Sequence, residues 1–253
     1  TDETKQQIAE QISPMLTEYS MYVSLNNDLF QRVKAVYEKK DELGLDQDQM
    51  TLLEDNYKSF VRGGANLSDE DKAVYSKLSE ELSLTTLQFS KNVLAATNAY
   101  TLHITDSTEL GGLPEFVKTM GAETAAEKGL EGWAFTLDYP SYGPFLKYST
   151  NRELRKQIWM AYNTRAIGGE NDNTEIVKKI VDLRIKIANI LGYETYADYA
   201  LEERMAKNRK TVDEFVMQLL KPSMEFAKKD VADVLAYAKK NGFEENVLQP
   251  WDF

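Results

Sequence analysis

The chain has 253 residues, of which 42% are hydrophobic, so its length permits one large domain or two smaller ones. Its 41 acidic and 30 basic side chains give a net charge of −11, which would repel nucleic acid and anionic lipid, and we expect neither as a partner. The absence of cysteine excludes disulfides, thiolate metal sites and a cysteine nucleophile, and no apolar stretch approaches the ~20 residues of a membrane-spanning helix.

Three helical patterns follow one another in the first half. Apolar residues recur at helical spacing over 28–44, which predicts a helix closed by a glycine cap. Asp46 with Gln49 forms a capping-box pattern for a second helix that ends before Gly63. The third pattern runs over 68–96 without Gly or Pro, so we expect the longest helix of the first half here.

The periodicity then changes from helical to alternating. Residues 100–105 and 133–137 each alternate apolar with other side chains, as half-buried strands do. A short helix should begin at Pro114 and run to Ala126 between them. The sequence therefore predicts a short antiparallel β pair around a helical insertion.

Helical periodicity resumes after the second strand. Asn151 is placed to cap a helix that ends before Gly168. A further helix should run over 173–192, and Thr195 with Asp198 can cap a short one after it.

The last long helix is predicted from a capping-box pattern, formed by Thr211 and Glu214, as far as Gly242. Pro222 should kink or break it. The expected fold class is mainly α, with one short β pair.

Candidate catalytic residues are few. A helical zinc site needs two histidines one turn apart, but His103 is the single histidine and lies on the polar side of a predicted strand. An ordinary exposed or hydrogen-bonded side chain is the favoured interpretation. A serine triad lacks both a second base and a G-x-S-x-G elbow.

Carboxylate pairs are the only abundant reagents. Glu80-Glu81, Glu202-Glu203 and Glu244-Glu245 fall in or near amphipathic helices, where solvated surface is the favoured interpretation over acid–base catalysis. Asn171-Asp172-Asn173 lacks the remaining oxygen ligands of a calcium loop and is better explained as a helix N-cap.

An aromatic cluster could mark either a ligand surface or packed core, and packing is favoured because aromatic side chains dominate cores. Its members are Tyr139, Tyr142, Tyr148 and Tyr162, near Trp133 and Trp159 in the sequence.

Ordered motifs along nearly the whole chain resemble the thimet oligopeptidase family of zinc peptidases, and among them the peptidyl-dipeptidase, or Dcp-like, branch. The matching segments are Phe60–Leu67, Phe89–Asn98, Gly112–Pro114, Trp133–Leu137, Phe145–Tyr148, Asn151–Arg155, Asn171–Asn173, Leu191–Tyr193, Ala197, Tyr199, Leu201-Glu202, Met205-Ala206 and Pro250–Asp252.

The resemblance implies a zinc metallopeptidase whose helical halves enclose a deep channel, and which cleaves short peptides and releases C-terminal dipeptides. The family's H-E-x-x-H helix has no counterpart here, so no catalytic residue, no metal ligand and no substrate-binding residue is assigned. Residues 1–253 would be a single non-catalytic segment, similar to the N-terminal half of neurolysin and forming one channel wall. Zinc would bind in the remaining, catalytic part of the longer protein.

Thr1 in the place of an initiating methionine fits a segment of a longer chain. The expected partners are short peptides and that remaining part, in the cytoplasm or the periplasm. The alternative is a stand-alone helical module that binds peptides or serves as a scaffold. A carboxylate-only hydrolase is a third possibility, and it requires a pair of acids with perturbed pKa values in a cleft.

Overall fold

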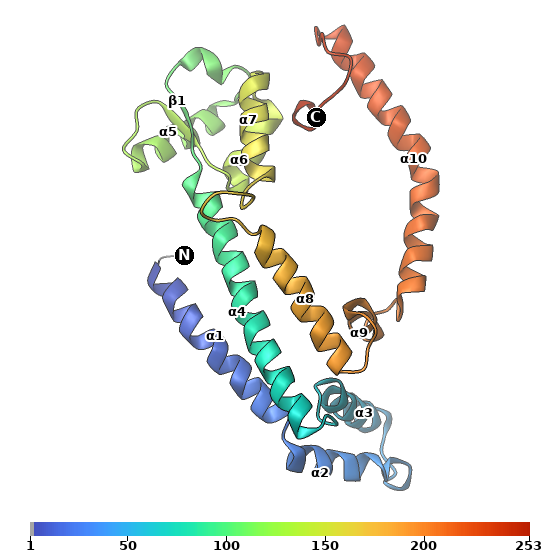
Figure 1. The fold of residues 1–253 in the computed structure, drawn as a ribbon. Coiled ribbons are helices and arrows are strands. Elements are labelled where there is room, and N and C mark those ends of the chain that lie inside the picture. The colour runs from blue at the N-terminus through green and yellow to red at the C-terminus, as the bar shows by residue number, and fades with distance from the viewer. Residues whose placement is uncertain (1–2) are drawn as a thin grey trace. The chain divides into compact units, whose positions relative to one another are not determined.

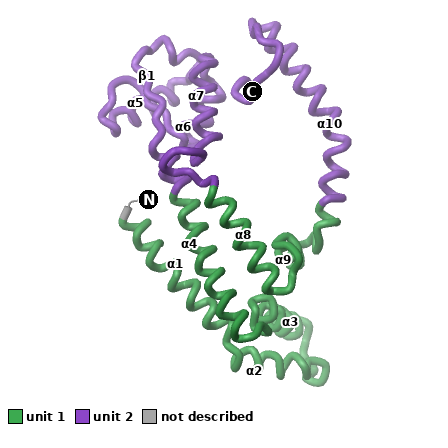
Figure 2. The backbone as a smooth tube through the Cα atoms, in the orientation of Figure 1, with its two compact units in different colours: residues 1–91, 175–212 green, residues 92–174, 213–253 purple. Residues whose placement is uncertain are grey.

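The computed structural model describes residues 3–253, and Thr1 lies outside the described residues. The chain is mainly α-helical, with a two-stranded antiparallel sheet, as the sequence predicts (Figure 1). No helix among residues 3–253 is long and apolar enough to cross a membrane. Two compact units are formed, residues 1–91 with 175–212 and residues 92–174 with 213–253 (Figure 2).

In the described part of the first unit, every regular element is a helix. Its elements are α1 (Glu3–Ser24), α2 (Asn27–Tyr37), η1 (Lys40–Glu42), α3 (Gln47–Arg62), the first part of α4 (Asp69–Ala99), most of α8 (Thr174–Ile190) and α9 (Tyr196–Glu202).

Helices α1, α4 and α8 lie side by side within this unit (Figure 1). The Ser13 and Ser83 hydroxyls are 2.8 Å apart and join α1 to α4. Lys179 of α8 forms an ion pair of 2.7 Å with Glu81 of α4. These cross-links fix the order α1, α4, α8.

Helix α2 packs on α3 through aromatic rings. Phe30, only 1% exposed, lies 5.9 Å from the Tyr57 ring and 6.0 Å from the Phe60 ring. Tyr37 stacks on Tyr57 at 3.9 Å. The helix predicted over 28–44 is too long, because α2 already ends at Tyr37. The backbone of Lys39 then leaves helical geometry, and the separate 3-10 turn η1 follows.

The second unit holds β1 (Leu102–Ile104), η2 (Ser107–Leu110), α5 (Glu115–Glu127), β2 (Trp133–Phe135), α6 (Tyr139–Tyr148) and α7 (Arg152–Asn163). It also holds the end of α4, most of α10 (Arg209–Lys240) and η3 (Pro250–Asp252).

The predicted β pair is confirmed: β1 and β2 are antiparallel, with Leu102 opposite Phe135 and Ile104 opposite Trp133. A hydrophobic core forms on this sheet. Its buried members come from both strands, from η2, α5, α6 and α7, and from the loops before α5 and α6: Leu102, Ile104, Leu110, Leu113, Val117, Phe135, Leu137, Tyr142, Phe145 and Ile158.

The sequence did not predict α1 or α6. Pro140 stands at the first turn of α6, where its missing N–H is not needed, but Pro144 lies inside the helix and weakened the helical signal. Helix α1 likewise contains a proline, Pro14.

Helix α10 differs from its prediction in two respects. Its first turn is capped by Asn208, whose side-chain oxygen accepts from the Thr211 backbone N–H at 2.9 Å, so the predicted Thr211–Glu214 capping box is wrong. Pro222 does not break the helix. The Ser223 hydroxyl donates to the carbonyls of Leu219 and Leu220, at 2.7 and 3.1 Å, in the turn next to the proline.

Candidate functional site

His103 is an exposed, hydrogen-bonded side chain, as predicted. It lies in the middle of β1, between two buried residues, and its Nε2 is 2.6 Å from the Glu131 carbonyl oxygen. Among residues 3–253 no group of three His, Cys, Asp or Glu side chains is arranged to hold a metal ion.

The segment Asn171–Asn173 lies immediately before α8, where the helix-cap interpretation places it. Asp172 Oδ1 accepts from the Thr174 hydroxyl at 2.6 Å and from the Thr174 N–H at 2.9 Å. These hydrogen bonds, with one from the Gly168 backbone, lower the pKa of Asp172. Asn173 is 4% exposed and accepts from Asn92 at 3.0 Å, which ties the loop to the end of α4.

The three carboxylate pairs have different surroundings. Glu81 and Glu245 form ion pairs, with Lys179 and Arg152, and remain partly exposed. Glu202 is likewise partly exposed, with 42% of its side chain accessible, but it is also held by protein donors. It accepts hydrogen bonds from Arg62 and from the Tyr193 hydroxyl.

A cluster of charged and aromatic side chains therefore surrounds Arg62, whose side chain is only 12% exposed. Besides Glu202, its guanidinium donates to the Tyr193 hydroxyl at 3.1 Å and to the Tyr199 carbonyl at 2.7 Å. The guanidinium carbon also lies 4.4 Å from the centre of the Tyr199 ring. Burial, followed by the hydrogen bond to Glu202, raises the pKa of Tyr193 to about 12, so this phenol stays protonated at neutral pH.

This cluster joins the end of α3 to the α8–α9 turn and to α9. The three hydrogen bonds that the Arg62 guanidinium donates all go to protein acceptors of α9 and of the turn before it. We interpret it as a structural junction, and its members fall within the motifs that carry the family resemblance.

The aromatic cluster is mostly core, as favoured from the sequence. Tyr142 is buried and stacks on Tyr162 at 4.1 Å, and Trp133 packs against the same core. Tyr139 is the exception, because 76% of it is exposed. Trp159 contacts Trp251 at 5.6 Å instead.

The Trp159–Trp251 contact belongs to a junction between α7 and η3. Arg152 makes a bidentate pair with Asp252, at 2.8 and 3.0 Å, and the Asp252 side chain is 4% exposed. Two buried donors nearby, Arg155 Nε and Trp251 Nε1, have no acceptor within the described part of the chain.

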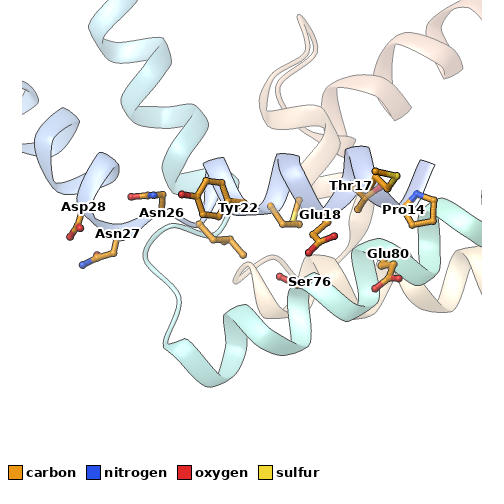
Figure 3. Close-up of a pocket in the computed structure, with 12 residues that line it drawn as sticks. Pro14, Thr17, Glu18, Tyr22, Asn26, Asn27, Asp28, Ser76 and Glu80 are labelled. Atoms are coloured by element: carbon orange, nitrogen blue, oxygen red, sulfur yellow. The ribbon is translucent and has the colours of Figure 1, made fainter. Parts of the chain in front are cut away.

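A groove of about 700 Å³ lies between α1, the start of α2 and α4, and we call it the α1–α4 groove (Figure 3). It is lined by Pro14, Met15, Thr17, Glu18, Met21, Tyr22, Leu25, Asn26, Asn27, Asp28, Ser76 and Glu80. Sequence reasoning missed it, because the apolar residues of α1 at helical spacing, from Ile8 and Ile12 to Tyr22, were not interpreted as a helix.

The helical segment described here is related to a class of peptidases. Residues 145–253 match the model of Peptidase family M3. Oligopeptidase A of Escherichia coli (strain K12) is 34% identical over 248 residues, which cover 96% of this chain and 36% of that protein. The predicted resemblance to the thimet oligopeptidase family is thus confirmed.

Two further relatives show the range of sequence identity. Dipeptidyl carboxypeptidase of the same organism is 32% identical over 257 residues, covering 100% of this chain and 37% of that protein. Saccharolysin of Saccharomyces cerevisiae (strain ATCC 204508 / S288c) is 26% identical over 213 residues, 82% of this chain and 29% of that protein. The chain spans about a third of the length of these relatives. The first two identities are too similar to separate an oligopeptidase A branch from a peptidyl-dipeptidase branch.

Proposed function

We propose that this chain is the helical, non-catalytic part of a zinc metallopeptidase, of the oligopeptidase or peptidyl-dipeptidase type, and that it forms one wall of a deep channel for short peptides. The observation that carries the proposal is the coverage: 96–100% of this chain aligns with relatives named as peptidases, but only 36–37% of each relative is matched.

Within residues 3–253, no three His, Cys, Asp or Glu side chains lie close enough together to hold a zinc ion. Its single histidine, His103, is hydrogen-bonded to a backbone carbonyl, and the chain has no cysteine. Zinc sites of hydrolases need three protein ligands from His, Glu, Asp or Cys. The proposal therefore places the zinc site in the remaining part of the longer protein.

Helix α10 supports the existence of that remaining part. None of its residues is buried, and its large apolar side chains are exposed, including Phe215, Leu219, Phe226 and Val231. Large exposed apolar patches mark interaction surfaces. The unsatisfied donors Arg155 Nε and Trp251 Nε1 also lack acceptors that further chain could supply.

Such a wall acts sterically. It excludes folded proteins from the channel and admits short, flexible peptides, so selectivity by length precedes the chemical step. The acidic charge of −11 would favour substrates that carry positive charge.

The test uses the full-length protein and the isolated chain side by side. The full-length protein should bind one zinc per chain and release dipeptides from short peptides in a chelator-sensitive reaction, whereas residues 1–253 alone should do neither. A full-length sequence without H-E-x-x-H, or one tightly bound zinc on residues 1–253, would overturn the proposal. The compartment, cytoplasm or periplasm, is settled by cell fractionation.

A further inference from the structure

The α1–α4 groove combines apolar surface with uncompensated negative charge. Met15 and Tyr22 line the groove and are 65% and 69% exposed. A ligand that covers these side chains would remove apolar surface from water, which favours binding. Its volume of about 700 Å³ lies within the roughly 300–1,000 Å³ of pockets that enclose small ligands. A peptide of a few residues would therefore fit the groove.

The charged residues that line the groove are all acidic. Glu18, Asp28 and Glu80 contribute carboxylates, and no Lys, Arg or His is among the lining residues. In Figure 3, Glu18 of α1 faces the helix α4, which carries both Ser76 and Glu80.

These carboxylates also lack internal partners, in contrast to their neighbours. Glu10 on α1 and Glu81 on α4 each form an ion pair, with Lys91 and Lys179. Within residues 3–253, no ion pair is formed by any of the three groove carboxylates.

We infer that the α1–α4 groove binds short peptide segments that carry both basic and apolar side chains. Basic groups of such a segment pair with Glu18 and Glu80, while its apolar groups cover Met15 and Tyr22. The Tyr22 ring can also take a cation on its face. A second copy of the chain is disfavoured as the occupant, because two chains of charge −11 repel each other.

This inference goes beyond the proposed function, since it concerns binding without cleavage and needs no metal. It is tested by calorimetry on the full-length protein with end-blocked peptides of D-amino acids, which resist peptidases. The probes are acetyl-Lys-Leu-Lys-Leu-Lys-amide and the matched peptides with Glu or Gln in place of Lys.

The Lys peptide should bind more tightly than the Gln peptide, the Glu peptide most weakly, and the preference should fade with added salt. The double variant E18Q/E80Q should weaken binding of the Lys peptide about three- to tenfold, since an exposed ion pair contributes up to about fivefold. The control E123Q/E127Q removes two exposed carboxylates from α5 and should leave the affinity unchanged.

Ser76→Trp provides a second test, because it fills the groove without changing the charge. It should abolish binding of the Lys peptide while circular dichroism stays unchanged. Equal affinity for the three peptides, equal effects of the two double variants, or a dimer that Ser76→Trp dissociates would each overturn the inference. Loss of peptidase activity with peptide binding retained would instead count against the proposed function alone.

Discussion

Arg62 links helices that are more than 130 residues apart in the sequence. Its guanidinium contacts Glu202 and Tyr193 and the carbonyl of Tyr199, and only 12% of its side chain is exposed. Planar, bidentate donors suit such a site better than a lysine does. The residue therefore stabilises the packing of α3 against α9.

We expect Arg62→Ala to lower the free energy of unfolding by about 1–3 kcal/mol, because it leaves Glu202 and the Tyr199 carbonyl without their donor. Arg62→Lys should recover only part of this, since an ammonium cannot make all the contacts. Urea denaturation measures both, with Arg32→Ala at an exposed position of α2 as the control. Equal stability of the Arg62→Ala and Arg32→Ala variants would contradict this role.

Asp252 makes the α7–η3 junction sensitive to acid. Burial by itself would raise its pKa, but hydrogen bonds from Arg152 and from the Gln249 N–H, together with the Arg152 charge, outweigh it and lower the pKa. A lowered folded-state pKa contributes stability that is present above the unfolded value, near 3.9, and is lost as pH falls through the folded value.

The junction should therefore persist at pH 5 and open below about pH 4. Fluorescence of Trp251, which contacts Trp159, reports the opening. Asp252→Asn should loosen the junction at neutral pH and remove most of the acid transition, whereas Asp230→Asn on α10 should not. If the acid transition is unchanged in Asp252→Asn, another titrating group causes it.

Two of the three predicted capping boxes are confirmed, and they were predictable because the partners are adjacent in the sequence. The capping boxes of Asp46 with Gln49 and of Thr195 with Asp198 are both present. The partners of Arg62 were not predictable, since no local spacing connects α3 with α9.

At the scale of elements, close contact with α5 makes β2 sensitive to a single methyl group. Gly121 of α5 lies against Phe135, whose ring is fully buried, and a Cβ there would come within 2.8 Å of the ring carbon Cζ. Gly143 of α6 is also helical, but a Cβ there would meet only the Tyr139 ring at an ordinary 3.5 Å.

The two glycines should thus respond to alanine with opposite signs. Gly121→Ala should destabilise by about 1–3 kcal/mol through overpacking, in spite of its better helix propensity. Gly143→Ala should be neutral or stabilise by up to about 1 kcal/mol, since only propensity changes. Thermal unfolding of the two variants compares them, and stabilisation by both would show that Phe135 can move aside.

Element boundaries were predicted well for five helices, and poorly where the chain leaves the helix before its glycine, as after Tyr37, or where proline intervenes. The sequence placed α3, α4, α5, α8 and α9 within a few residues. Internal proline obscured α6, and in α10 the structure uses Asn208 as the cap although Thr211 offered a better pattern. Tertiary context decides such cases, because several caps compete within one turn.

At the scale of the whole molecule, α10 is the helix that most needs a further partner to cover its apolar side chains. A helix of 32 residues with no buried side chain has little tertiary packing to stabilise it. Its exposed apolar residues alternate with charged ones such as Lys228 and Lys229, which are paired only within the helix. The proposed catalytic part would cover this apolar surface.

Hydrogen exchange on the full-length protein tests this at every residue of α10. We expect amides of 209–240 to be protected there about as strongly as those of α8, and to exchange much faster in residues 1–253 alone, because an unpacked helix opens locally. Phe226→Ser should speed exchange in the full-length protein and leave that of the isolated chain unchanged, since Phe226 is already 69% exposed. Helix α8, whose Leu183 and Ile187 are buried, serves as the internal reference. Fast exchange of α10 in both proteins would mean that no other part covers it, and would favour the stand-alone module over the wall of a peptidase.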